Sequence, residues 1–312
     1  MVMEVLVTGA TGFVGSCLAR RLVDLNYDVH IFTRINSNKW RIKDLLGQVT
    51  EHEVDLRDAG NVKKVVHKIA PAIVCHLATY GGFSFQKTPS IIIESNLIGT
   101  INLLRACEKT GFNCFINTGS SSEYGIKPVP MSECDILEPV GDYGVSKAAA
   151  TLFCRSEAIE KNLPIVTLRL FSPYGPWDDP KRLIPYVIKS LLRGEPPALS
   201  VPESCRDFVY IDDVLDSYLK VIKTPLTGGG IFNIGSGNQH SIGEVVALIT
   251  EMLGSGLEPR WGMVNSHRAE PSSWVADIEK TRIKLGWLPK TSLWEGLKKT
   301  TAWIRENLEL YP

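Results

Sequence analysis

Tyr143 and Lys147 are the two residues of this sequence whose types and spacing point most directly to chemistry. They stand four residues apart at the start of an alanine-rich segment, residues 148–154, which is typical of a helix. Four residues make about one helical turn, so the phenol and the ammonium share a face. An ammonium beside a tyrosine favours the ionised phenol, which can then exchange a proton with a substrate oxygen near neutral pH. Ordinary surface pairs have the same spacing, so its meaning depends on the surrounding elements.

Three glycines at three-residue intervals, Gly9, Gly12 and Gly15, follow a strand-like apolar run at residues 4–7. Apolar residues at helical spacing come next: Val14, Leu18 and Leu22. This order predicts a strand, a tight turn and a helix whose first N–H groups face an anion. A flexible turn without a ligand is the alternative, but the strand and helix on either side favour binding of a dinucleotide pyrophosphate.

The second expected strand, residues 28–33, ends in Thr33 and Arg34, near the place where the adenosine ribose of a dinucleotide would lie. A carboxylate there would bind both ribose hydroxyls of NAD, and neither residue carries one. A guanidinium suits the 2′-phosphate of NADP, and Lys39 and Arg41 add basic charge nearby. The pattern therefore favours NADP(H) and leaves NAD(H) open as the alternative cofactor. An ordinary solvated basic loop is the reading without a ligand.

Two further strand-like runs end where ligands of parallel sheets bind. Residues 48–54 lead into Asp55 and Leu56, which could flank an adenine. Residues 72–78 are apolar around His76, which we expect to be a core histidine with satisfied hydrogen bonds rather than a catalyst.

Ser120 follows another strand-like run that begins at residue 112. It precedes Tyr143 by about twenty residues, and the carboxyl ends of parallel strands meet at one sheet edge. We therefore expect Ser120 to lie beside Tyr143 over the cofactor, where both could bind the same substrate oxygen. A serine-rich turn that caps a helix is the alternative.

Strands that alternate with helices predict an α/β fold, namely a Rossmann-type, doubly wound parallel sheet with helices on both faces. We expect residues 1–171 to form the dinucleotide-binding domain, with 207–234, including strands near Phe208 and Phe232, returning to it. Residues 172–206 and 235–312 would form a smaller C-terminal substrate lobe. The segment 90–110 reads as one long helix.

That segment is apolar on more than one helical face, so the sheet alone would not cover it. We expect a homodimer that pairs through the helices near 90–109 and 142–161. Asn96 within the segment could make a buried polar contact to backbone.

The composition narrows the partners. The 312 residues include 34 basic and 34 acidic side chains, so no whole-chain charge favours nucleic acid or an anionic membrane. The seven cysteines lack C-x-x-C spacing and fit reduced core thiols better than bridges or zinc ligands, and no metal is predicted. Apolar runs stay shorter than the roughly 18 residues of a membrane helix, so we expect a cytoplasmic protein that binds small molecules.

Taken in order, the motifs resemble the extended short-chain dehydrogenase/reductase family that acts on nucleotide sugars. The resemblance covers nearly the whole chain. It is carried by Gly9-Ala-Thr-Gly12-Phe-Val-Gly15, Asp55-Leu56, His76-Leu-Ala78, Asn96, Ser120 before Tyr124-Gly125, Tyr143-x-x-x-Lys147, Arg169-Leu-Phe-Ser-Pro-Tyr-Gly-Pro176, Arg206-Asp-Phe208 and Leu285-Gly-Trp287.

The resemblance implies that Ser120, Tyr143 and Lys147 form a catalytic trio. Tyr143 would exchange a proton with the sugar C4 oxygen while a hydride passes between C4 and the nicotinamide. Lys147 would assist the phenol and hold the nicotinamide ribose, and Ser120 would share the C4 oxygen. The implied cofactor contacts are Gly9, Thr11, Gly12, Phe13, Val14, Gly15, Arg34, Asp55, Leu56, Leu77, Ala78, Asn96, Tyr143 and Lys147. The implied contacts to the nucleotide-diphosphate sugar are Thr79, Ser121, Ser122, Ser172, Arg206 and Arg268, of which the two arginines would grip the diphosphate.

Two departures from the family pattern bear on the reaction. Dehydratases of the family place an acidic residue directly after the serine or threonine, whereas Ser121 and Ser122 stand there and Glu123 comes one place late. Dehydration needs a carboxylate for the C5 proton and is therefore disfavoured. Many relatives also have asparagine where Ser172 stands.

The remaining choice is between a 4-ketoreductase, which consumes NADPH, and a 4-epimerase, which keeps NAD bound. Thr33-Arg34 favours the first, and the pattern from Gly119 to Gly125 is similar to that of GDP-4-keto-6-deoxy-mannose reductases. The sequence therefore predicts NADPH-dependent reduction of a nucleotide-linked 4-keto sugar. The alternatives are a 4-epimerase of the UDP-hexose type and a non-catalytic dinucleotide-sensing regulator.

Overall fold

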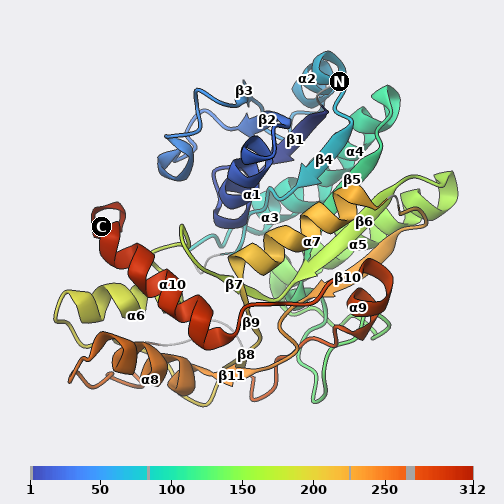
Figure 1. The fold of residues 1–312 in the computed structure, drawn as a ribbon. Helices are drawn as coiled ribbons and strands as arrows, with labels where there is room; N and C mark the ends of the chain where they lie inside the picture. Colours follow the sequence, from blue (N-terminus) through green and yellow to red (C-terminus); the bar gives the residue numbers. More distant parts are fainter. Residues whose placement is uncertain (1–2, 83–84, 225, 265–270, 312) are drawn as a thin grey trace.

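The computed structural model describes residues 3–82, 85–224, 226–264 and 271–311 (Figure 1). Within them, seven parallel strands form one sheet in the order β10-β6-β5-β4-β1-β2-β3. Their bounds are β1 Glu4–Thr8, β2 Asp28–Thr33, β3 Thr50–Glu53, β4 Ile73–His76, β5 Cys114–Ser120, β6 Ile165–Leu170 and β10 Gly230–Ile234. The order reverses between β1 and β4, where a crevice for ligands forms at the carboxyl edge. The predicted doubly wound parallel sheet is confirmed.

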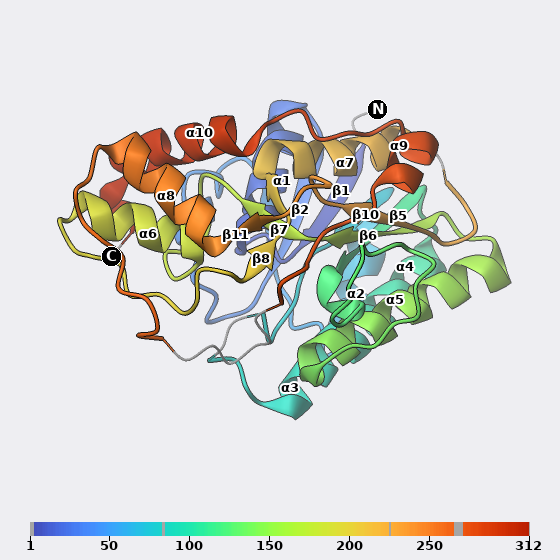
Figure 2. The ribbon, with the colours of Figure 1, turned by 90° about the horizontal axis from the view of Figure 1, so that it is seen from below.

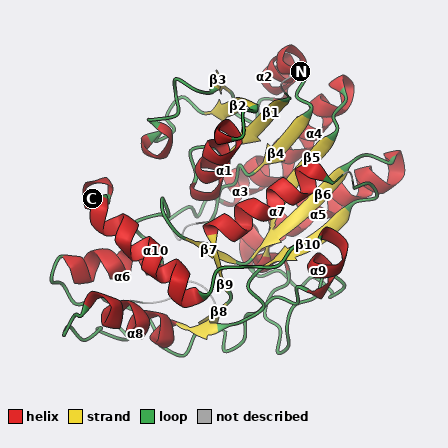
Figure 3. Cartoon of the chain, in the orientation of Figure 1, coloured by secondary structure: helices red, strands yellow, loops and turns green. Residues whose placement is uncertain are grey.

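Helices cover both faces of this sheet, as Figures 2 and 3 show. Helices α1 (Phe13–Asp24) and α7 (Ile211–Lys223) pack on one face, and α2 (Ala59–Ile69), α4 (Gly99–Thr110) and α5 (Gly141–Lys161) pack on the other. Alternate residues of a strand point to opposite faces, so Val5 and Val7 join the first core while Leu6 joins the second. Both faces are therefore buried, as the continuous apolar strands require.

The predicted helix at 90–110 has an irregular middle. Helix α3 (Pro89–Ile93) continues into α4 through a π-helical turn at Glu94–Ile98. Asn96 lies buried in this turn, where its side chain bonds both the N–H and the C=O of Tyr80 at 2.7 Å. A widened turn of this kind places a side chain where a regular helix would not.

The C-terminal part is built from shorter elements. Strand β7 (Ser172–Tyr174) pairs with β9 (Phe208–Tyr210), and β8 (Cys205–Arg206) pairs with β11 (His240–Ser241). Helices α6 (Leu183–Leu192), α8 (Ile242–Leu253) and α10 (Leu293–Glu306) pack together, at the lower left of Figure 1. Helix α9 (Glu279–Leu285) lies against β10.

The returning segment divides between the two parts. Strand β10, around Phe232, joins the edge of the large sheet beside β6. The strand at Phe208 does not join it, because β9 pairs with β7 instead. The domain boundaries drawn from the sequence stay a prediction.

Local sequence sets several helix starts. Ser241 and Glu244 form a capping box at the start of α8, and Ser292 and Glu295 form another at α10. Asp58 accepts the Asn61 N–H at the start of α2. These bonds satisfy N–H groups that the first turn of a helix leaves unpaired.

The composition led to two expectations, one about the cysteines and one about membrane-spanning helices. The seven cysteines are unbonded, five of them are buried, and burial raises the pKa of Cys154 to about 12. Such thiols stay protonated at neutral pH and are poor nucleophiles. In the described part of the chain, no helix is long and apolar enough to cross a bilayer.

Candidate active site

A cavity of about 1140 Å³ opens at the carboxyl ends of the central strands. This exceeds the roughly 300–1,000 Å³ usual for one small molecule, so two ligands can share it. The predicted residues that line it are Gly9, Thr11, Gly12, Phe13, Val14, Gly15, Arg34, Asp55, Leu56, Leu77, Ala78, Thr79, Ser120, Ser121, Ser122, Tyr143, Lys147, Ser172 and Arg206. Asn96 is buried behind the loop that it binds, and Arg268 lies outside the described residues.

The glycine turn has no room for side chains. Gly9 has φ +74°, and a Cβ there would lie 2.6 Å from Ala78 N, while a Cβ on Gly15 would lie 2.3 Å from Gly9 O. Gly12 precedes α1 and provides no side-chain cap, so the first N–H groups of the helix remain for an external acceptor. Bare backbone at a helix N-terminus fits the pyrophosphate of a dinucleotide.

The end of β2 has a carboxylate that the sequence pattern did not reveal. Thr33 Oγ1 donates to Glu51 Oε1 at 2.5 Å, and Lys39 forms an ion pair with the same group. Bonds from Lys39 and Thr33 hold the pKa of Glu51 below its usual value. Because Glu51 is in β3, 18 residues from Thr33, only the pairing of β2 with β3 brings them together.

Asp55 lines the cavity as expected, but it is not alone. Arg57 binds it through Nε to Oδ1 at 3.0 Å and through Nη2 to Oδ2 at 2.7 Å. This pair holds the pKa of Asp55 below its usual value. The carboxylate is therefore ionised and fixed in orientation beside Leu56.

Helix α5 carries Tyr143 and Lys147 to the cavity from its first turns. Lys147 is buried, and its Nζ donates to the carbonyl of Thr118 near the end of β5. Gly144 allows the helix to approach the turn after β5, since a Cβ there would lie 2.7 Å from Ser122 O. The structure thus ties the helix to the strand that delivers Ser120.

Ser120 ends β5 and starts a short 3₁₀ turn, Ser121–Glu123. Its Oγ accepts the Ser122 N–H at 3.2 Å, so its own O–H proton can be donated to a substrate oxygen. Ser121 is buried and accepts Trp274 Nε1–H at 3.1 Å, so this predicted substrate contact already has a protein partner.

Glu123 points into the protein core. It is fully buried, and its Oε2 accepts Arg169 Nε–H at 2.7 Å. A carboxylate paired in this way is not offered to a sugar C5 proton, which agrees with the disfavoured dehydration.

His76 is a structural histidine. Its Nδ1 lies 2.7 Å from Thr8 Oγ1 and its Nε2 lies 2.8 Å from Thr100 Oγ1, both between buried side chains. Burial, together with the nearby Lys147 charge, lowers the pKa of His76 to about 3. The ring is neutral at physiological pH and has the role that the sequence predicted.

Arg206 and Trp274 bring the C-terminal part to the cavity. Arg206 Nη1 donates to Ser204 Oγ at 2.9 Å and to the Cys205 carbonyl at 2.7 Å. Its guanidinium lies 5.8 Å from the centre of the Trp274 ring. These contacts place a cation in the lining of the cavity.

The sequence analysis missed a cluster of acidic and basic residues that follows β7. Asp178, Asp179 and Arg182 line the cavity, and Asp178 is buried. Burial raises the pKa of Asp178 to about 6, although Arg182 Nε lies 3.8 Å away. Arg41 joins this group to the glycine turn, since it bonds Asp179 at 3.3 Å and the Thr11 carbonyl at 3.4 Å. No motif in the sequence marks these residues.

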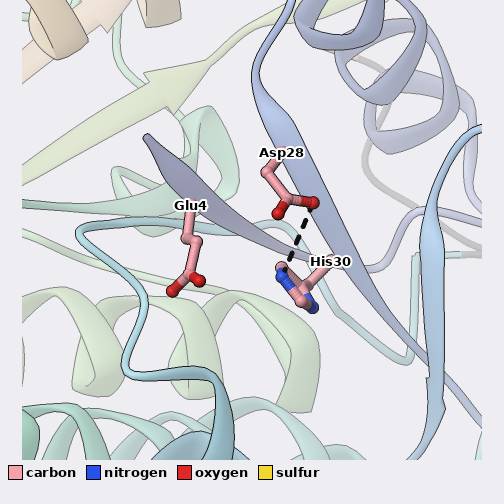
Figure 4. A group of neighbouring side chains, drawn as sticks. All are labelled: Glu4, Asp28 and His30. Atoms are coloured by element: carbon pink, nitrogen blue, oxygen red, sulfur yellow. Dashed lines mark ion pairs between the residues drawn. The ribbon is translucent and has the colours of Figure 1, made fainter. Parts of the chain in front are cut away.

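A separate group lies at the opposite end of the sheet, near the starts of β1 and β2 (Figure 4). Glu4, Asp28 and His30 each offer one metal-ligand atom, all within 4.8 Å of one another. His30 Nε2 lies 3.7 Å from Asp28 Oδ1, and His30 Nδ1 lies 2.9 Å from His52 Nε2. An imidazole beside two carboxylates is also common on protein surfaces without a metal. This group lies away from the cavity and is not part of the candidate active site.

Known proteins match most of this chain. The family model described as "NAD dependent epimerase/dehydratase family" matches residues 5–235. The UDP-glucuronate 4-epimerase of Thermodesulfobacterium geofontis is 29% identical over 317 residues, which span 98% of this chain and 97% of that protein.

Solved structures agree with the fold. The UDP-glucose 4-epimerase of Thermotoga maritima, determined with UDP-glucose, has a TM-score of 0.91 and 29% identity, covering 98% of this chain and 100% of that one. The UDP-glucuronic acid 4-epimerase of Bacillus cereus, in complex with UDP-glucuronic acid and NAD, has a TM-score of 0.87 and 27% identity, with coverage of 98% and 100%.

Proposed function

The chain belongs to the NAD dependent epimerase/dehydratase family, within the extended short-chain dehydrogenases/reductases, and on this premise we propose that it is a nucleotide-sugar 4-epimerase that uses NAD. The observation that carries the proposal is that the glycine turn, Ser120, Tyr143 and Lys147 line one cavity with Arg206. Membership of this family makes the chain an enzyme, which sets aside the sensing regulator.

The epimerase replaces the 4-ketoreductase that the sequence favoured. The ketoreductase rested on Thr33 and Arg34, which suggested NADPH. The similar Bacillus cereus enzyme is described with NAD, and the similar proteins reported above are 4-epimerases.

In the proposed reaction, Tyr143 takes the proton of the sugar C4 hydroxyl and later returns it to the C4 oxygen. Ser120 donates a hydrogen bond to that oxygen throughout. Lys147, whose Nζ donates to the Thr118 carbonyl, would hold the nicotinamide ribose. When bound on the glycine turn, NAD supplies the acceptance and return of the C4 hydride. Between the removal and the return of the hydride, the sugar turns the opposite face of C4 toward the cofactor site. The configuration at C4 is therefore inverted.

The substrate we propose is a nucleoside diphosphate hexose. Arg206 lines the cavity and can form charge-assisted bonds to the diphosphate. Thr79, Ser122 and Ser172 line the same cavity and can bind sugar hydroxyls. Arg268 is retained as a predicted diphosphate contact.

We also propose a homodimer. Apolar side chains are exposed along the helices named in the sequence prediction, with Ile98 at 41% near the start of α4 and Leu152 and Ile159 of α5 at 52% and 59%. A second copy would bury these side chains and complete the cover of both helices. Light scattering coupled to gel filtration would find twice the chain mass, and a monomer at micromolar concentration would contradict the dimer.

The function is tested by incubating the purified protein with UDP-hexoses and UDP-hexuronates without added cofactor. We expect interconversion of C4 epimers, followed by chromatography or NMR, with no net change in reduced nicotinamide absorbance. Stoichiometric oxidation of NADPH by a 4-keto sugar nucleotide, without any epimer formation, would instead restore the ketoreductase.

A Tyr143→Phe variant tests the assigned proton carrier. It should bind cofactor normally but lose about 10²–10⁴-fold in turnover, because the phenol that carries the proton is gone. Turnover equal to that of the unchanged protein would contradict the mechanism.

A further inference from the structure

We propose that Glu123 is a positioning residue, whose single buried carboxylate holds Ser120 and the helix of Tyr143 and Lys147 in a fixed relation. This inference rests on the proposed function, because it takes Ser120 and Tyr143 as the groups that meet the sugar. Glu123 itself faces the core and touches neither ligand.

One oxygen of Glu123 joins the two elements that carry the chemistry. Oε1 accepts the backbone N–H of Ser120 at 2.8 Å and the hydroxyl of Thr151 at 3.0 Å. Thr151 lies on α5 one turn beyond Lys147 and two turns beyond Tyr143, on the same helical side. Strand β5 and helix α5 are thus bridged by a single atom.

The second oxygen prevents the carboxylate from turning. Oε2 accepts Arg169 Nε–H at 2.7 Å, and Arg169 stands on β6 beside Gly119 of β5. The Arg169 guanidinium lies 4.6 Å from the centre of the Tyr124 ring, whose hydroxyl donates to Asn233 on β10 at 2.7 Å. With partners on both oxygens and no exposed surface, Glu123 is held in one orientation.

Two glycines make this arrangement sterically possible. A Cβ on Gly119 would lie 2.6 Å from Glu123 Oε1, and a Cβ on Gly144 would lie 2.7 Å from Ser122 O. One glycine gives the carboxylate its place and the other lets α5 touch the turn. Gly119 lies where the Glu123 side chain packs against β6, and Gly144 lies where the turn meets α5.

The expected consequence is specific to the chemical step. Ser120 and Tyr143 must reach the same C4 oxygen, and a ~1 Å misplacement can cost about a hundredfold in rate. Arg206 and the glycine turn bind their ligands without contacting Glu123. Loss of the bridge should therefore lower kcat and leave KM and cofactor affinity nearly unchanged.

Thr151→Val is the sharpest test, because it keeps the side-chain shape and the Glu123–Arg169 pair but removes the hydroxyl that ties α5. We expect kcat to fall about tenfold, with KM for the sugar nucleotide within about twofold. Thr151→Ser restores the hydroxyl and should recover most of the lost kcat. The matched control is Thr300→Val in α10, a buried threonine that donates to the Gly296 carbonyl and should leave kcat unchanged.

The variants Ser120→Ala and Tyr143→Phe distinguish a failure of the positioning role from a failure of the proposed function. If neither lowers turnover, the proposed function fails and the positioning role fails with it. If both lower turnover while Thr151→Val keeps the wild-type kcat, only the positioning role is overturned. It is also overturned if Thr300→Val lowers kcat equally, if Thr151→Ser gives no recovery, or if KM rises in proportion to the loss of kcat.

Discussion

Behind the cavity lies an inner wall, defined by Ser120, Glu123, Thr151 and Arg169, of which only Ser120 lines the cavity, and on its lining lies an outer rim, defined by Arg34, Asp178, Asp179 and Arg182. Each side contains a buried carboxylate. The Glu123 oxygens accept three bonds from protein donors, at 2.7, 2.8 and 3.0 Å. Asp178 Oδ1 accepts the Asp179 N–H at 2.7 Å, while Arg182 Nε remains 3.8 Å away.

The comparison of Glu123 with Asp178 shows that the effect of burial on a carboxylate depends on its partners. A buried charge needs close partners, and where they are present the group becomes a rigid support. Where the cation stays at a distance, desolvation dominates and the carboxyl becomes a group that titrates, as the raised pKa of about 6 for Asp178 indicates. The inner wall therefore has a fixed geometry, and the outer rim holds a carboxyl whose pKa burial raises to about 6.

Removing Arg169 should have the largest effect on stability. Arg169→Met leaves the Glu123 carboxylate buried without its cation, and we expect a loss of about 3–5 kcal/mol in the free energy of unfolding. Urea unfolding at pH 7 measures it. The double variant Glu123→Gln/Arg169→Met should recover most of that loss, because no charge is left in the core. A single-variant loss below about 1 kcal/mol, the value of an exposed pair, would remove the contrast.

Asp178→Asn should raise the stability of the folded protein, and the size of this gain should depend on pH. The folded-state pKa of Asp178 is raised from 3.8 to about 6, so the folded protein binds more protons than the unfolded chain between these values. Stability from this group therefore falls as pH rises from about 4 to 6, by up to about 3 kcal/mol.

The asparagine variant should lack that slope and be more stable than the unchanged protein at pH 8. Thermal unfolding midpoints measured from pH 4 to 8 test this. Equal midpoints for the two proteins at every pH would mean that Asp178 is as well supported as Glu123.

Gly119→Ala should disturb the inner wall by crowding. The new methyl group would meet Glu123 Oε1 at 2.6 Å and Arg169 Cγ at 2.9 Å. We expect a cost of about 1–3 kcal/mol in unfolding free energy, together with a lower kcat. Gly47→Ala is the control, since nothing lies within 4 Å of a Cβ at that exposed position. If Gly119→Ala and Gly47→Ala had the same unfolding free energy and kcat, the residues of the inner wall would have to shift at little cost to accommodate the methyl group.

Arg34→Ala should have the smallest effect and concern the cofactor. Arg34 is exposed on the rim, so stability should hardly change. If its guanidinium meets a 2′-phosphate, affinity for NADP should fall about tenfold while NAD affinity stays within about twofold. Fluorescence titration of both cofactors measures this. A larger loss for NAD would assign Arg34 to the adenosine instead.

The sequence predicted most of what depends on local pattern. Alternating strands and helices gave the parallel sheet, and glycine spacing placed the turn at Gly9 to Gly15. Ser120, Tyr143 and Lys147 could be expected near one cavity because ligands of parallel sheets bind at the carboxyl edge, and all three line it. His76 was correctly predicted to be a core residue, since it stands inside an apolar run.

The rest depends on distant pairs. Glu123 and Arg169 are 46 residues apart, and no spacing rule links them. Glu51 reaches Thr33 only because β2 and β3 pair, so reasoning from residues 33–41 could not include this contact. Strand β9 leaves the large sheet because β7 offers it a partner, which is a choice between competing pairings rather than a local preference.

The π-helical turn at Glu94–Ile98 makes this stretch sensitive to chain length rather than to side-chain type. It accommodates one residue more than a regular helix would, and deleting one residue there would let α3 and α4 merge into an unbroken α-helix. The widened turn already absorbs the extra residue, so the flanking parts of α3 and α4 would keep their faces and the change would be confined to the turn itself. Asn96 would turn away from Tyr80, and the loop at the cavity mouth would lose its anchor although the number of apolar residues had not changed.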